Sequence, residues 1–157
     1  KAAVFKNLIV EGAKITGSGV DNCHGAVLVA TPRGVLKVNH VTVKNATISN
    51  CDRSSVLVAY LYFNNAEIAN THIEGCTVNS IGTAGAFLGM ANNHNLKVSD
   101  SKVHNTTISS SEGGSKAGIY LGTKLKSEKH EFINCTHTNS KAINDGIESQ
   151  ILIGREV

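Results

Sequence analysis

The chain of 157 residues is long enough for one domain, residues 1 to 157, and too short for two ordinary ones. Its 15 Lys and Arg against 12 Asp and Glu give a net charge of only +3, and the basic residues are scattered, so we expect no nucleic-acid partner. The longest apolar run, residues 56 to 63, is far shorter than the roughly 20 residues of a membrane-spanning helix, so we expect no membrane span. No signal-peptide pattern is visible, which predicts a cytosolic chain or a processed piece of a longer one.

Internal repetition is the strongest feature of the sequence. The stretches "AKITGS", "ATISNC", "CTVNSI", "TTISSS" and "THTNSK" begin at residues 13, 46, 76, 106 and 136, at steps of 33, 30, 30 and 30. A second set, "GAVLVA", "SVLVAY", "GAFLGM" and "AGIYLG", begins at residues 25, 55, 85 and 117 and has nearly the same period. The sequence therefore predicts five copies of one unit.

Within each unit, apolar residues occur in pairs two apart, which is the period of a β-strand, and a two-residue interruption separates the pairs. A first column of interruptions is rich in Gly and Asn, which adopt left-handed backbone conformations at low cost: Gly12, Asn45, Gly75 and Asn105. A second column is polar throughout: Asn7, His40, Asn70, Asp100 and His130. The units are therefore predicted to be short strands joined by corners.

Short strands that recur every 30 residues can bury their apolar faces only if successive units stack on a shared core. We therefore predict an all-β fold, a right-handed parallel β-helix of about five coils with about 30 residues per coil. Stacked coils place equivalent residues ~4.8 Å apart, and two outward columns alternate in charge as such stacking favours. These columns are Lys37, Glu67 and Lys97, and Glu11, Lys44, Glu74 and His104. The predicted core is Val38, Val43, Ile48, Ile68, Ile73, Val78, Val98, Val103 and Ile108.

These segments carry a resemblance to known repeats. The "GAVLVA" and "GAFLG" segments followed by "ATISNC" or "TTISSS" resemble the GLUG-type repeats of bacterial surface proteins and the wider pectate-lyase-like β-helix group. The five-residue units of "AEIANTHIEGCTVNS" resemble relaxed pentapeptide repeats. The resemblance implies a right-handed coil and an extracellular or cell-surface location.

One small cluster could support chemistry on an acidic glycan. Asp21 and Asp52 are expected close together in adjacent coils, and Arg53 follows directly. Polysaccharide lyases and hydrolases need a general base and, in many lyases, calcium, and such a site could be built here. Two aspartates in turns are more commonly solvated turn residues, so we assign no catalytic residue, metal or cofactor.

A second candidate is an outward column of hydroxyls at Thr47, Thr77 and Thr107. It is flanked by a mixed column of Thr16, Ser49, Asn79, Ser109 and Asn139. Ranks of Thr on a flat β-helix face resemble ice-binding surfaces, but Thr is also a common residue on any exposed strand face. Ice binding is therefore the third of our functional alternatives.

The four cysteines lack the CxxC spacing of zinc or thioredoxin-type sites. Cys23 and Cys51 are expected at nearly the same height in neighbouring coils, where they form a disulfide in an oxidising compartment or remain free core-lining thiols. Cys76 is expected to be unpaired and inward.

These observations predict a non-catalytic structural or adhesive module, displayed on a surface or assembling end to end through the open ends of the β-helix. The alternative is a carbohydrate-active enzyme or a glycan-binding module.

Overall fold

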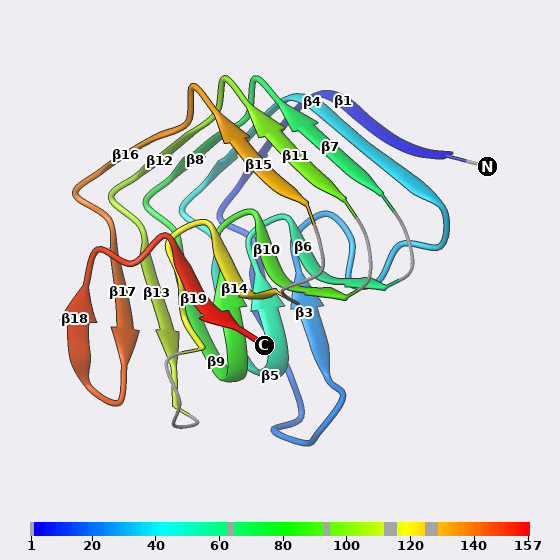
Figure 1. The fold of residues 1–157 in the computed structure, drawn as a ribbon. Helices are drawn as coiled ribbons and strands as arrows, with labels where there is room; N and C mark the ends of the chain where they lie inside the picture. Colours follow the sequence, from blue (N-terminus) through cyan, green and yellow to red (C-terminus); the bar gives the residue numbers. More distant parts are fainter. Residues whose placement is uncertain (1, 63–64, 93–94, 112–115, 125–128) are drawn as a thin grey trace.

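The computed structural model describes residues 2–62, 65–92, 95–111, 116–124 and 129–157. Within these ranges it is an all-β solenoid of parallel strands (Figure 1). Strands from successive coils lie side by side in three sheets, which we name A, B and C. The predicted stacking of about five coils is therefore confirmed.

Sheet A forms two sides of each coil. Its strands are β1 (Ala2–Glu11), β4 (Val35–Lys44), β7 (Ala66–Ala69), β8 (His72–Glu74), β11 (Leu96–Ser99), β12 (Lys102–His104), β15 (His130–Ile133) and β16 (Thr136–Thr138).

Sheet B follows sheet A along the chain. Its strands are β2 (Lys14–Thr16), β3 (His24–Ala26), β5 (Thr47–Ser55), β9 (Thr77–Gly85), β13 (Thr107–Ser110), β17 (Lys141–Asn144) and β18 (Ile147–Ser149). Strand β18 is antiparallel to β17, whereas the other pairs of this sheet are parallel.

Sheet C closes the coil with β6 (Val58–Tyr62), β10 (Leu88–Asn92), β14 (Leu121–Lys124) and β19 (Ile153–Glu156).

The corners of sheet A depend on left-handed residues. The first corner has positive φ at Asn7, His40, Asn70, Asp100 and Asn134, and the second at Gly12, Asn45, Gly75, Asn105 and Asn139. Side-chain amides stack at the first corner, where Asn70 Nδ2 donates to Asn39 Oδ1 at 3.0 Å and Asn134 Nδ2 donates to Asp100 Oδ1 at 3.1 Å. These repeated bonds and the cheap left-handed conformation of Asn and Gly explain the bends.

The last coil departs from the predicted alignment. Thr107 pairs with Lys141 and Lys102 pairs with Thr136, so the fourth step is 34 residues and the fifth copy begins at Ser140, not Thr136. His130 pairs with Leu96 within a strand, and Asn134 occupies the corner that we assigned to His130. Likewise Ile143, not Asn139, pairs with Ser109.

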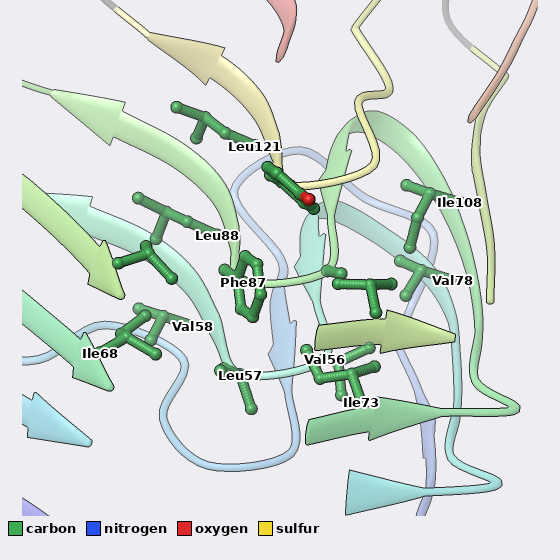
Figure 2. Close-up of a cluster of buried hydrophobic side chains, with 14 of the residues drawn as sticks. Val56, Leu57, Val58, Ile68, Ile73, Val78, Phe87, Leu88, Ile108 and Leu121 are labelled. Carbon is green, nitrogen blue, oxygen red and sulfur yellow. The ribbon is translucent and has the colours of Figure 1, made fainter. Parts of the chain in front are cut away.

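The interior is a stack of aliphatic side chains. All nine predicted core residues are buried, and Ile48, Val78 and Ile108 lie on one another in register. Phe87 and Leu57, from the turns between sheets B and C, fill the space between the sheets (Figure 2). Each fully buried side chain of this size contributes about 1.5–3 kcal/mol through removal from water.

The outward charge columns have the predicted pairing. Lys37 Nζ lies 3.5 Å from Glu67 Oε2, and Lys44 Nζ lies 3.3 Å from Glu74 Oε2. These exposed ion pairs add at most about 1 kcal/mol each. Their main contribution is to the register, because a slipped strand would lose both ion pairs.

Among the residues that the structure describes, no helix has the length and apolar character that crossing a membrane requires.

Candidate functional site: a groove between sheets B and C

The predicted cluster lies at the junction of coils 1 and 2. The Asp52 carboxylate accepts the backbone N–H of Asn22 at 3.3 Å, so the turn that contains Asp21 lies against β5 as expected. Arg53 Nη1 lies 2.9 Å from Asp52 Oδ2. Asp52 is therefore engaged by a guanidinium and a backbone amide, while Asp21 is exposed.

Arg53 is the centre of a wider polar and aromatic cluster. The Arg53 Nη1 atom donates to Asn22 Oδ1 at 3.3 Å and lies 2.9 Å from His24 Nε2. The Arg53 Nε atom donates to Met90 Sδ at 3.4 Å, and the guanidinium carbon lies 4.8 Å from the centre of the Tyr60 ring. A cation over an aromatic face is a stabilising geometry. Arg53 is thus held from several sides.

His24 is adapted to this cation. Because Arg53 can only donate, His24 Nε2 must accept, and the proton then lies on Nδ1, 2.7 Å from Thr31 Oγ1. Burial and the nearby Arg53 charge lower the pKa of His24, and Asp52 opposes this only in part. The imidazole is therefore neutral at pH 7.

Arg53 and Met90 belong to two residue columns that face one another along the solenoid axis. The sheet B column is His24, Arg53, Thr83 and Lys116, and the sheet C column is Tyr60, Met90, Thr123 and Arg155. We name the space between these columns the B–C groove.

Glycines form the floor of the B–C groove. A Cβ atom on Gly89 would lie 2.7 Å from Ser54 O, one on Gly122 would lie 2.7 Å from Ala84 N, and one on Gly154 would lie 2.6 Å from Ala117 C. Real Cβ atoms do not approach backbone so closely, so only glycine allows the two sheets to touch here. Each glycine contacts the preceding coil, and the residues beside these contacts therefore face each other: Arg53 with Met90, Thr83 with Thr123, and Lys116 with Arg155.

A cavity of about 290 Å³ opens in the groove. It is lined by Asp52, Arg53, Thr83, Met90, Lys116, Thr123, Arg155 and Val157. Thr83 and Thr123 are only 8% and 3% exposed, and neither hydroxyl oxygen has a hydrogen-bond partner. An unsatisfied buried hydroxyl costs about 1–3 kcal/mol, which makes this pair the least satisfied polar feature of the groove.

The predicted Thr column is present but short. Thr47, Thr77 and Thr107 pair in register on sheet B, and Lys14 and Lys141 occupy the two ends of the same column. Ser109 donates to Asn79 Oδ1 in the neighbouring column at 2.7 Å. Lysines thus limit the rank of hydroxyls to three.

Cys23 and Cys51 lie together as expected, with free thiols and sulfur atoms 3.0 Å apart. Burial and the neighbouring Cys23 raise the pKa of Cys51 to about 12. Cys76 is buried with a free thiol, as predicted.

Sequence reasoning found Asp52 and Arg53 but missed most of the groove. Thr83, Lys116, Thr123 and Arg155 were not singled out. A usable signal was the glycine that directly precedes the sheet C residues, in "GM", "GT" and "GR" at 89, 122 and 154. In the described ranges, no group of three or more His, Cys, Asp or Glu residues is placed to hold a metal ion.

Comparison of the chain with protein-family models, with curated proteins and with solved structures gives no match. The class that the fold defines is a parallel β-solenoid, and the resemblance to GLUG-type and pectate-lyase-like repeats stays a prediction.

Proposed function

We propose that the protein is a non-catalytic structural or adhesive module, extracellular or on a cell surface, which self-associates through its first coil. The observation that carries this proposal is the incomplete burial of that coil's inward side chains. Phe5, Leu8 and Ile15 are only partly buried, whereas their partners in the second coil, Val38, Val41 and Ile48, are at most 1% exposed. Covering the first coil would remove further apolar area from water.

The backbone of β1 supports the same surface. Outward strand residues donate to the preceding coil: Thr77 N to Ala46 O and Lys102 N to Thr71 O, both at 2.8 Å. By the same rule, the N–H groups of the outward residues Val4 and Ile9 point to the side of β1 where a preceding coil would lie, away from β4. Their side chains are 60% and 72% exposed. Such an apolar strand edge favours pairing with another strand.

The opposite end of the solenoid favours a closed dimer over a growing fibre. Antiparallel β18 covers β17 at the last coil, so the strand order of sheet B does not continue there as it does between coils. A two-fold axis through Ile9 would pair the two β1 segments that follow the Asn7 corner antiparallel, with Leu8 opposite Val10 of the second copy. A second copy of this chain is therefore the proposed occupant.

The test is sedimentation of the chain over a concentration series. We expect a monomer–dimer equilibrium for the unchanged protein and a monomer for Ile9→Lys, because two lysines would meet at the axis. Val20→Lys is the matched control, since Val20 is 59% exposed outside the strands and should leave the dimer intact. Far-UV circular dichroism checks that both variants fold. A monomer at every concentration, or an unaffected Ile9→Lys dimer, contradicts the proposal.

The geometry of Asp52 supports a non-catalytic role. Glycan-cleaving sites commonly use two carboxylates in cooperating roles, whereas Asp52 is paired with Arg53. Purified protein should therefore leave acidic and neutral polysaccharides intact with or without calcium. Depolymerisation that disappears in Asp52→Ala would establish the enzyme instead.

A further inference from the structure

We propose that the cavity in the B–C groove is a binding subsite for the oxyanion of an acidic oligosaccharide, with Arg155, Lys116, Thr83 and Thr123 as the contacting residues. This inference goes beyond self-association and does not depend on it, because the first argument concerns β1 and this one concerns the groove.

The charges of the cavity favour an anion. Three cationic side chains line it, Arg53, Lys116 and Arg155, against the single carboxylate of Asp52. Asp52 lies 2.9 Å from Arg53, and the formal charges of the four lining side chains sum to +2. Guanidinium and ammonium groups that converge on one cavity are suited to a carboxylate or sulfate.

The two threonines supply the neutral donors of such a site. Their hydroxyls are buried and without hydrogen-bond partners, and both side chains line the cavity. Because the glycine floor places Thr83 opposite Thr123, a rotation about each Cα–Cβ bond would turn both hydroxyls toward one bound oxyanion. A ligand would thus satisfy the two groups that the protein leaves unsatisfied.

The rest of the groove favours a sugar as the carrier of the anion. Beyond Arg53 the sheet C wall continues to Tyr60 and Tyr62, whose rings lie 5.5 Å apart, and Tyr62 is 43% exposed. Asn92 Nδ2 donates to the Tyr60 hydroxyl at 3.0 Å. The exposed ring of Tyr62 beside a charged pocket matches the apolar face of an oligosaccharide. A cavity of about 290 Å³ fits one small anionic unit rather than a long chain.

The experiment is isothermal titration calorimetry of residues 1–157 at low salt. The probes are an oligogalacturonate, a heparin-derived oligosaccharide of similar length, a neutral malto-oligosaccharide, poly-glutamate and sodium sulfate. We expect binding of at least one acidic oligosaccharide, and much weaker binding of the neutral sugar, the acidic peptide and the free ion.

Three variants locate the site. Arg155→Gln removes an exposed cation and should weaken binding about tenfold or more, as expected for one charge-assisted hydrogen bond. Thr123→Val keeps the side-chain shape and removes the buried hydroxyl, so it should weaken binding severalfold while the thermal midpoint stays equal or rises. Lys102→Gln makes the same charge change on sheet A and should leave binding unchanged.

If the Thr123 hydroxyl binds ligand, Thr123→Val lowers the affinity without lowering the thermal midpoint. If the hydroxyl has a structural role, the thermal midpoint falls. Absence of binding to both acidic oligosaccharides, or equal weakening by Lys102→Gln and Arg155→Gln, overturns the site. Sulfate or poly-glutamate binding as tightly as the oligosaccharide overturns the assignment to a glycan.

Discussion

Replacing Gly122 by alanine tests whether the close contact of sheets B and C holds the solenoid together. The added Cβ would clash with Gly89 O and would lie 2.7 Å from both Ala84 N and Ala84 O, which are all backbone atoms that cannot rotate away. Ordinary contacts of carbon are about 3.5–4.0 Å, so β14 and β9 must separate by roughly 1 Å. Overpacking of this kind costs about 1–3 kcal/mol and occasionally more.

We expect Gly122→Ala to lower the free energy of unfolding by about 3 kcal/mol, which is a large share of the ~5–15 kcal/mol of a typical domain. With a urea dependence of roughly 2 kcal/mol per M, the midpoint of the transition followed by far-UV circular dichroism should fall by about 1.5 M. The control is Gly12→Asn, at a corner with no atom within 4 Å of the new Cβ and with Asn at equivalent corners. A Gly122→Ala midpoint within about 0.3 M of the unchanged protein would refute the argument.

Three further predictions concern the core and the thiols. Ile73→Asp should prevent folding, because Ile73 is fully buried and an unpaired buried carboxylate costs several kcal/mol. Ile147→Asp is the control and should fold, because the Ile147 side chain is 71% exposed. Far-UV circular dichroism of both variants tests this. Oxidised glutathione should convert Cys23 and Cys51 to a disulfide, and the protein then loses two hydrogen atoms while the glutathione is reduced. Mass spectrometry should show this loss in the unchanged protein and not in Cys23→Ser. Reduced protein should keep its free energy of unfolding up to about pH 9 and lose it progressively at higher pH. The reason is that folding raises the pKa of Cys51 and of Tyr120 to about 12, so the native state retains protons that the unfolded chain releases. A urea midpoint that rises from pH 9 to 11 would contradict this.

The coil and its core were predictable because stacking imposes the same chemistry at the same interval. Ile48, Val78 and Ile108 follow this rule, and the structure places them in one stack. The fifth coil was misaligned because neighbouring five-residue units resemble one another. "THTNSK" fits the repeat nearly as well as the stretch from Ser140, and sequence alone does not penalise a slip of four residues.

The groove was less predictable for a different reason. Arg53 could be noticed because it directly follows Asp52, but its contact with Met90 joins residues 37 apart in sequence on different sheets. Strand periodicity shows which side of a strand faces outward, not which other outward side chains lie opposite. The facing pairs Thr83 with Thr123 and Lys116 with Arg155 follow from the glycine contacts, which only the folded backbone shows.

The direction of the backbone hydrogen bonds has a mechanical consequence. Parallel pairing joins each coil only to its neighbours, so nearly all of these bonds point along the stacking axis. Tension applied between the two ends of the solenoid would load the hydrogen bonds of one coil boundary at a time. The coils should therefore detach one after another at low force. Tension across the axis would instead act along the strands and load many bonds together in shear. A molecule of this design resists stretching much better across its stack than along it.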